Sequence, residues 1–187
     1  MDSKLQVISG TYRGRKLALP GGARPTQNMA RGAIFNMLAA FFSADDKINV
    51  WDAFAGSGAL GIEALSRYGN SNVVFTDVSE ESIKNLRKNT VDIAANRICI
   101  TRADAANVIK NYASGANLIF VDPPYEDARV GIDFVANLAG SVRAGTIVVQ
   151  EIERVVSYTP DTTKWEILRD KTYGRARFLI LRRNGNK

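Results

Sequence analysis

The chain has 187 residues, of which 45% are hydrophobic and 24% charged, as in a soluble globular protein with one main domain. It has no histidine and one cysteine, which excludes histidine-assisted nucleophiles, the common zinc sites and internal disulfides, so we expect no metal. The sequence RICIT predicts that Cys99 is a buried strand residue. Neither a membrane span nor a signal peptide is evident, which predicts a cytoplasmic protein without membrane contact.

The net charge of +6 is unevenly distributed along the chain. Residues 1–31 carry six basic and one acidic side chain, and residues 164–187 carry eight basic and two acidic ones. The stretch between them carries eleven basic and sixteen acidic side chains. Positive charge concentrated at both ends favours a polyanionic partner, such as a nucleic acid.

The N-terminal segment has the pattern of a hairpin. Residues 5–18 read as two short strands around Ser9-Gly10, and a glycine- and proline-rich loop follows. We therefore expect a β-hairpin and loop over residues 1–25, ahead of a main domain over residues 26–187.

An amphipathic helix comes next, with Thr26 or Asn28 as its cap. Apolar residues recur at helical spacing, which predicts one face packed on a core. The residues of that face are Ala30, Ala33, Ile34, Met37, Leu38, Phe41 and Phe42.

Strand-like and helix-like segments then alternate. The expected strands are 48–54, 72–77, 97–104, 117–122 and 145–151. Helices are expected between them, one of them near 105–112 and one capped by Ser79. This alternation predicts an α/β fold, with a mostly parallel sheet and helices on both faces. Residues 164–183 read as two strands with a turn at Tyr173-Gly174, and because no helix separates them we expect an antiparallel pair.

Four of the expected strands end in or next to a carboxylate. These residues are Asp52, Asp77, Asp104 and Asp122. Ligands of such sheets bind at the carboxyl ends of the strands, so this edge is where we look for a site.

A G-x-G-x-x-G spacing runs from Gly56 to Gly61, after Asp52. Alone, this spacing indicates only a nucleotide-like ligand. A carboxylate beside the loop repels pyrophosphate and attracts a cation, which favours S-adenosylmethionine over a nicotinamide cofactor. Asp77 can accept from ribose hydroxyls, and Asp104, followed by the small Ala105, can accept from an adenine amino group.

The second motif is DPPY, which comprises Asp122, Pro123, Pro124 and Tyr125. An exocyclic amine on a base is a poor nucleophile because its lone pair is delocalised into the ring. Asp122 and the Pro123 carbonyl can each accept one of its N–H groups, which orients the lone pair and offsets the developing charge. The prolines hold these acceptors still, and Tyr125 can stack on the base.

These motifs resemble class I S-adenosylmethionine-dependent methyltransferases, and more closely the bacterial 16S ribosomal RNA guanine-N2 methyltransferases of the small-subunit methyltransferase D group. The resemblance rests on ISGTYRGRKLALP, RPT, IFNML, DAFAGSGALGIEALSRYG, VDPPY and KTYGRARFLILRR. It implies a Rossmann-like, mostly parallel seven-stranded sheet, methyl transfer to the N2 amine of a guanine, and S-adenosylhomocysteine as the product. It also implies a monomer that acts on 16S rRNA or the 30S subunit.

The resemblance further implies a role for individual residues. The cofactor-binding residues would be Asp52, Ala53, Phe54, Gly56, Ser57, Gly58, Asp77, Val78, Asp104 and Ala105. The target amine would be held by Asp122, Pro123, Pro124 and Tyr125. The RNA phosphates would be met by Arg13, Arg15, Lys16 and Arg24. The chain departs from the family after RPT, where Asn28, Met29 and Gly32 replace an acid, an arginine and a glutamate, while Arg31 is retained.

Other functions remain open at this point. An adenine-N6 DNA methyltransferase shares the DPPY chemistry but would need to flip its base out of a duplex. A protein-glutamine methyltransferase would normally carry asparagine in place of Asp122. A nicotinamide-dependent oxidoreductase and a non-enzymatic RNA-binding module are the further alternatives.

Overall fold

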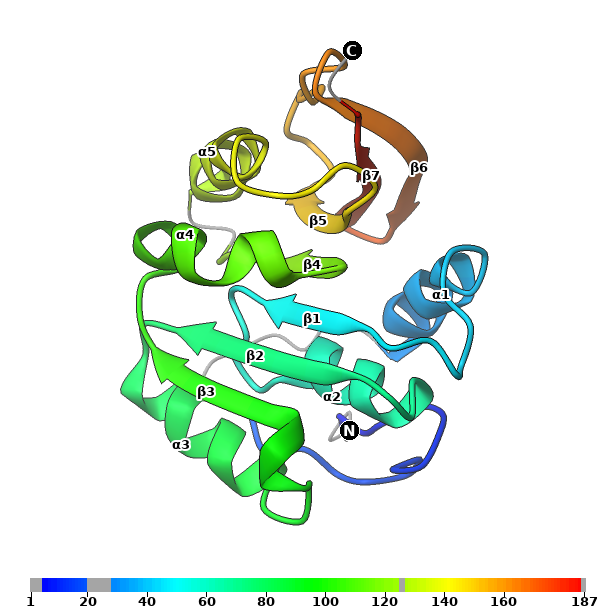
Figure 1. Ribbon diagram of the computed structural model, residues 1–187, viewed down its shortest axis with the longest axis vertical. Helices are drawn as coiled ribbons and strands as arrows, with labels where there is room; N and C mark the ends of the chain where they lie inside the picture. Colours follow the sequence, from blue (N-terminus) through cyan, green and yellow to red (C-terminus); the bar gives the residue numbers. More distant parts are fainter. Residues whose placement is uncertain (1–4, 20–27, 125–126, 186–187) are drawn as a thin grey trace.

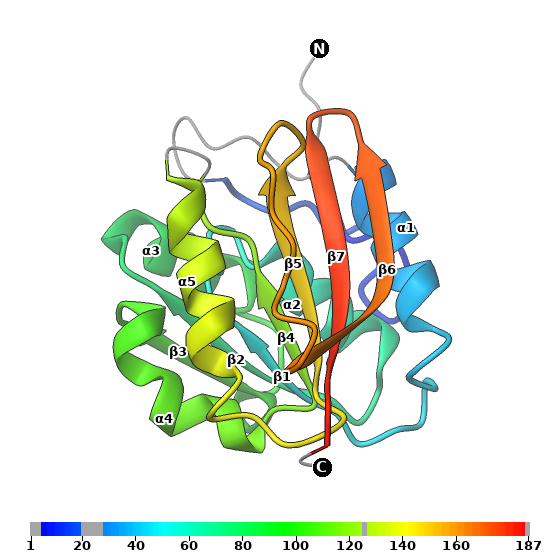
Figure 2. The same cartoon turned by 90° about the horizontal axis from the view of Figure 1, so that it is seen from above.

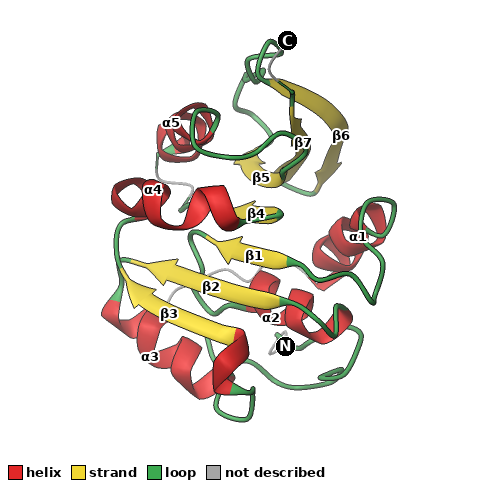
Figure 3. Cartoon of the chain, viewed as in Figure 1, coloured by secondary structure: helices red, strands yellow, loops and turns green. Residues whose placement is uncertain are grey.

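The protein folds around one seven-stranded sheet with the order β3-β2-β1-β4-β5-β7-β6 (Figures 1 and 3). The structure is a computed structural model that describes residues 5–19, 28–124 and 127–185. The strands are β1 (Asn49–Asp52), β2 (Asn72–Asp77), β3 (Ile98–Arg102), β4 (Leu118–Val121), β5 (Ile147–Glu153), β6 (Trp165–Tyr173) and β7 (Ala176–Arg183). The helices are α1 (Asn28–Leu38), α2 (Ala59–Arg67), α3 (Glu80–Asn89), α4 (Ile109–Tyr112) and α5 (Ala128–Leu138), with short 3₁₀ turns at η1 (Ala95–Arg97), η2 (Ala105–Val108) and η3 (Ala113–Gly115).

The sheet matches the mostly parallel arrangement expected from the sequence. Strands β1 to β5 pair in parallel, whereas β7 pairs antiparallel with both β5 and β6. The turn between β6 and β7 includes Gly174, whose φ of 60° is a conformation that glycine adopts without strain. Within the described residues, no helix is both long and apolar enough to cross a lipid bilayer.

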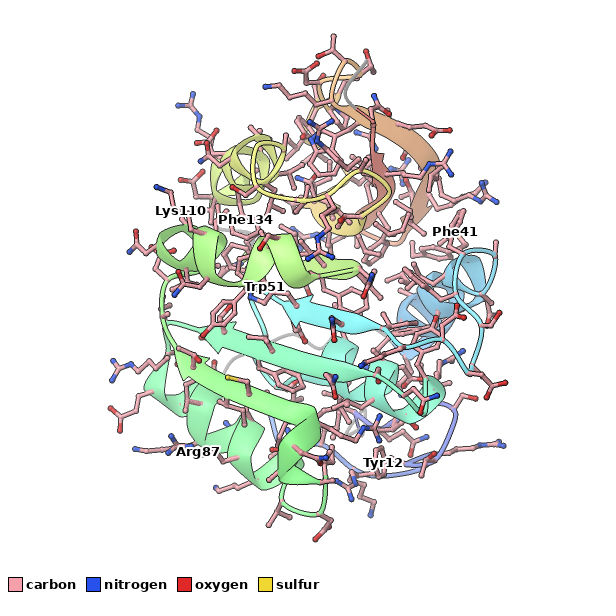
Figure 4. The ribbon with its side chains drawn as sticks, viewed as in Figure 1. Tyr12, Phe41, Trp51, Arg87, Lys110 and Phe134 are labelled. Atoms are coloured by element: carbon pink, nitrogen blue, oxygen red, sulfur yellow. The ribbon has the colours of Figure 1, made fainter. Side chains whose placement is uncertain are left out.

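Helices cover both faces of the sheet, as Figure 2 shows for α1 and α5, which lie on opposite sides. The first core lies beneath α1, α2 and α3 and includes Ile34, Ile62 and Leu86. The second core lies beneath α4 and α5 and includes Trp51, Ile109 and Phe134. Figure 4 shows Trp51 and Phe134 close together, and their rings are 5.5 Å apart.

The first helix is shorter than its apolar pattern predicts. It ends at Leu38, and Phe41 and Phe42 lie in the turn that follows. Phe41 nevertheless packs against the molecule, with the guanidinium of Arg169 on β6 5.8 Å from its ring centre (Figure 4). Ser79 caps α3 as predicted, because its side chain accepts from Ser82 N at 3.3 Å.

The predicted N-terminal strands are reduced to one isolated antiparallel bridge, between Gln6 and Lys16. A few backbone hydrogen bonds flank this bridge, from Val7 N to Arg15 O and from Leu17 N to Leu5 O, both at 2.9 Å, but the bend of the segment is held by α2. The N–H groups of Ile8 and Ser9 donate to the Glu63 carboxylate at 2.8 and 3.1 Å. Leu5, Val7 and Leu17 are buried in the first core. The division of the chain at residue 25 stays a prediction.

The prediction that Cys99 is buried was wrong. Cys99 does lie on a strand, but its side chain is exposed. Strand β3 is at the edge of the sheet, where it pairs with β2 alone, and α3 packs beside it. The apolar run RICIT therefore reflects the preference of an edge strand for β-branched residues rather than full burial.

Candidate active site

The carboxyl ends of β1, β2 and β4 bring three of the four predicted carboxylates together. Strand β1 pairs with β2 on one side and with β4 on the other, so Asp52 lies between Asp77 and Asp122. Burial is the main cause that raises the pKa of Asp52, and the negative charges of Asp122 and Asp77 raise it further, as expected for three neighbouring carboxyl groups. Asp104 lies beyond them, after β3, and is exposed.

The glycine loop between β1 and α2 has two residues with positive φ, Gly56 at 53° and Gly58 at 79°. A β-carbon on Gly56 would meet no atom within 4 Å, so open space lies beside this residue. A β-carbon on Gly58 would lie 2.5 Å from Leu86, and one on Gly61 would lie 2.3 Å from Phe75. Gly56 therefore borders the space that a ligand can use, whereas Gly61, and in part Gly58, lets α2 pack closely on its neighbours.

Asp52 caps the first turn of α2 from the end of β1. Its Oδ2 accepts from Gly61 N at 2.9 Å, and only 2% of the residue is exposed. Gly58, the N-cap position of the helix, makes no side-chain cap bond, so Asp52 supplies an acceptor that the helix start lacks. Burial raises the pKa of Asp52 to about 8. The carboxyl group is therefore mostly protonated at neutral pH, which differs from the charged, cation-attracting group expected from the sequence.

Asp77 organises the glycine loop. Its Oδ2 accepts from Gly56 N and its Oδ1 from Ser79 N, both at 2.8 Å. Each oxygen keeps a second lone pair, and the residue is partly exposed, so it can still accept hydroxyl groups from a ligand. The adjacent Val78 is 63% exposed, which leaves an apolar side chain uncovered at this edge.

The remaining predicted cofactor residues differ in how they face the site. Asp104 caps η2 by accepting from Ala106 N at 2.9 Å, and Ala105 beneath it is 3% exposed. Ala53 is buried in the second core, and Phe54 packs its ring 5.1 Å from that of Phe134. These two residues can offer a ligand little besides backbone atoms and ring edges.

Asn89, which no sequence motif singled out, ties the glycine loop to the N-terminal segment. Its Nδ2 donates to Ser57 O at 2.9 Å and to Ala18 O at 3.0 Å, and its Oδ1 accepts from Ala18 N at 2.8 Å. The residue is 5% exposed. The sequence contains no signal for this role, because many helices end in an asparagine that makes no such long-range contacts.

The DPPY motif begins directly after β4, as predicted. Asp122 is partly exposed, Pro123 is buried and Pro124 is exposed, whereas Tyr125 lies outside the described residues. Helix α5 presses against Pro123 through Gly131, where a β-carbon would lie 2.8 Å from Pro123 Cγ. Pro123 is thus held between the end of β4 and the first turns of α5.

A small cavity lies beside the motif. Its lining consists of Pro123, Pro124, Ala128, Glu151, Ile152 and Glu153. Glu151 is only 5% exposed. It falls at the end of an expected strand, yet it was not among the predicted strand-end carboxylates, so this residue was missed although its signal was present in the sequence.

The predicted RNA-binding residues separate into two groups. Arg13 and Lys16 are exposed, whereas Arg24 lies outside the described residues. Arg15 is held internally, because it donates to Asn89 O at 3.1 Å and pairs with Asp92 at 3.3 Å. The same contacts bring this segment to the end of α3.

Two further exposed basic residues, Arg87 and Lys88, occupy the last turn of α3. Figure 4 shows Arg87 pointing outward. At the other end of the chain, much of the positive charge is already paired. Arg175 binds Glu153 at 2.5 Å, Arg177 binds Asp170 at 2.7 Å and Arg182 binds Glu166 at 2.5 Å.

The segment that departs from the family pattern has a structural role in α1. Arg31 is fully buried, donates to the Gln6 carbonyl and to Asn28 Oδ1, and lies 3.7 Å from Glu63 Oε2. Burial lowers the pKa of Arg31, and the nearby Glu63 opposes this effect. Asn28 thus supports the retained arginine, while Met29 is 74% exposed.

The chain is similar to known proteins in both sequence and fold. A family model described as "Conserved hypothetical protein 95" matches residues 5–182. The chain is 29% identical to "Ribosomal RNA small subunit methyltransferase D" of Escherichia coli, over 97% of this chain and 91% of that protein. It is 30% identical to "Putative rRNA methyltransferase YlbH" of Bacillus subtilis, over 97% of this chain and 100% of that protein.

Among solved structures, the chain is similar to a putative methyltransferase, yhhF, from Escherichia coli, with a TM-score of 0.79 and 28% identity over 98% of this chain and 99% of that one. A precorrin-6y C5,15-methyltransferase from Geobacter metallireducens shares the fold with a TM-score of 0.64 at 15% identity, over 90% of this chain and 94% of that one. The Rossmann-like methyltransferase fold expected from the sequence is thereby confirmed.

Proposed function

The chain belongs to the Conserved hypothetical protein 95 family, and on that premise we propose that it transfers a methyl group from S-adenosylmethionine to the exocyclic N2 amine of a guanine in 16S rRNA. The observation that carries the proposal is the position of Asp122 and Pro123. They follow β4, next to the strand whose end leads into the glycine loop. A methyl acceptor and a methyl donor held at these two places would meet at one edge of the sheet.

The residues at this edge fit S-adenosylmethionine. The open space beside Gly56 gives room for a ligand close to the backbone. Asp77 retains lone pairs for ribose hydroxyls, and the exposed Val78 offers an apolar surface to a flat ring. When bound, the cofactor supplies a methyl group on a positively charged sulfur, which needs no metal and no histidine.

The acceptor side requires only groups that orient an amine. The Asp122 carboxylate and the Pro123 carbonyl would accept one N–H each, so that the amine lone pair points toward the donor. Both acceptors also stabilise the positive charge that develops on nitrogen. The contact between Gly131 and Pro123 holds the Pro123 carbonyl in place. Such a reaction depends on this kind of fixed orientation between the reacting groups.

A ribosomal RNA substrate is supported by two observations. The E. coli relative is named a ribosomal RNA small subunit methyltransferase. The exposed Arg13 and Lys16, and the exposed Arg87 and Lys88 at the end of α3, offer positive charges that suit RNA phosphates. We place the reaction in the cytoplasm, where ribosomal subunits are available, and propose that the enzyme acts as a monomer.

The test is mass mapping of methylated guanosine in small-subunit rRNA from cells with and without the protein. We expect one N2-methylguanosine to disappear without the protein and to return when the unmutated chain is supplied. An unchanged map would contradict the proposed function. Incorporation of labelled methyl groups into DNA but not into rRNA would instead favour the adenine-N6 alternative.

A further inference from the structure

Glu151 is a buried carboxylate beside the acceptor motif. It lies on β5, is 5% exposed and lines the small cavity together with Pro123 and Pro124. Val121 of β4 is in register with Gln150 of β5, so the residues that follow them, Asp122 just after β4 and Glu151 within β5, come side by side.

The alternation of side chains puts Glu151 and Asp122 on the same side of the sheet. On β5, Ile147 and Val149 point into the first core, and Glu151 continues that series. Asp52 also faces this side, because it binds Gly61 of α2, and the charge of Asp122 reaches Asp52. A base whose amine is held at Asp122 would therefore have its neighbouring edge atoms near Glu151.

The edge atoms of guanine and adenine differ in one way that a carboxylate can detect. In guanine the ring nitrogen N1 carries a hydrogen and stands next to the N2 amine. In adenine N1 is a bare acceptor that stands next to the N6 amine. An ionised carboxylate has acceptors only, so it binds the N1–H of guanine and repels the N1 lone pair of adenine.

We propose that Glu151 determines the choice of guanine by accepting a hydrogen bond from its N1–H while Asp122 and Pro123 hold the N2 amine. This inference rests on the proposed function and adds the residue that separates it from adenine methylation. Glu153 lines the same cavity, but we assign it no contact with the base, because its carboxylate is paired with Arg175 at 2.5 Å.

The experiment uses the nucleotide located by mass mapping and compares two RNA substrates. One carries guanine at that nucleotide, and the other carries 2-aminopurine, which keeps the amine at C2 but lacks the N1–H. The quantity measured is the ratio of kcat/KM for guanine to kcat/KM for 2-aminopurine. Since both values come from the same protein sample, a fraction of damaged protein cancels from the ratio.

For Glu151→Gln we expect the ratio to fall by about 10- to 100-fold, the effect of one hydrogen bond to a charged group, because the amide can donate to the bare N1 of 2-aminopurine. Glu153→Gln, the matched control, should keep the ratio of the unmutated protein. A Glu151→Gln protein that loses activity on both RNAs in equal proportion has an unchanged ratio, which would overturn the inference.

Glu151→Asp carries the test if Glu151→Gln does not fold. The shortened carboxylate keeps its charge but lies farther from the base. We therefore expect a ratio that is lower than that of the unmutated protein but still above 1, the value for a protein that does not distinguish the two bases. A ratio equal to that of the unmutated protein would overturn the inference while the proposed function stands. If the unmutated protein methylates no guanine in rRNA at all, the proposed function fails and the inference fails with it.

Discussion

Gly131 in α5 faces Pro123 so closely that a β-carbon at position 131 would lie 2.8 Å from Pro123 Cγ. No sequence pattern singled out Gly131. The contact nevertheless connects it to Pro123 of the DPPY motif, which the sequence analysis did single out. A proline ring cannot rotate away as a flexible side chain can, so any addition at Gly131 must move either the helix or the motif.

We therefore expect Gly131→Ala to lower kcat for methyl transfer by about 10-fold or more, because even small displacements of a reacting group are costly. The affinity for S-adenosylmethionine should change little. Alanine favours a helix over glycine by about 1 kcal/mol, which offsets part of the strain in the free energy of unfolding. Gly140→Ala is the control, since a β-carbon there meets no atom within 4 Å. Equal kcat values for the two variants would contradict this view of the contact.

Asp122→Ala should lower the rate of methyl transfer by about 100-fold or more, as removal of one group that stabilises developing charge does in other enzymes. Binding of S-adenosylmethionine, measured by calorimetry, should stay close to that of the unmutated protein. Asp133→Ala removes an exposed carboxylate on α5 and should leave the rate unchanged. Strong residual transfer by Asp122→Ala would refute the assigned role.

Asp52 predicts a specific dependence of stability on pH. Burial raises its pKa from 3.8 to about 8, so the folded protein holds a proton that the unfolded chain releases. The stabilisation is fully present below about pH 4 and is lost as the pH rises through about 8. In Asp52→Asn an amide oxygen still accepts from Gly61 N but does not titrate.

The free energy of unfolding, measured by urea denaturation across this range, should therefore fall for the unmutated protein relative to Asp52→Asn. We expect a relative fall of at least about 1.4 kcal/mol, the equivalent of one pKa unit. Two parallel profiles would show that Asp52 titrates near its ordinary pKa in the folded protein.

The exposed Arg13 and Lys16 predict how RNA binding depends on salt. Replacing Arg13 and Lys16 by glutamine should flatten the plot of log K against log salt, by about 0.7 to 0.9 for each RNA phosphate that the protein no longer neutralises. Lys110→Gln is the control, because Lys110 is also exposed but lies on α4, far from Tyr12 of the N-terminal segment (Figure 4). An unchanged slope in the double variant would place the RNA elsewhere.

Arg15→Gln should behave differently from its neighbours. The ion pair with Asp92 is partly exposed and contributes about 0 to 1 kcal/mol, so the free energy of unfolding should fall by about 1 kcal/mol at most. We expect a smaller change in the salt slope than for Arg13 and Lys16, because the guanidinium is occupied by α3. A decrease in slope equal to that of the double variant would mean that RNA displaces the bonds of Arg15 to α3.

The sequence by itself determined the order and type of the main elements, because the periodicity of apolar residues is local. It also predicted that Asp52, Asp77 and Asp122 gather at one edge of the sheet, because parallel strands that alternate with helices end on the same side. The resemblance carried by DPPY and the glycine loop gave the same fold that the comparisons confirmed.

Only the tertiary structure decided what each side chain does there. Burial depends on neighbours that are distant in sequence, which is why Cys99 is exposed, Asp52 is a largely neutral helix cap, and Arg15 is an internal contact. The N-terminal hairpin forms only one bridge, and its bend is held by a distant residue, since the N–H groups of Ile8 and Ser9 donate to Glu63 on α2. Gly131 is brought against Pro123 by packing alone, so its contact with the motif becomes visible only when β4 and α5 are placed side by side.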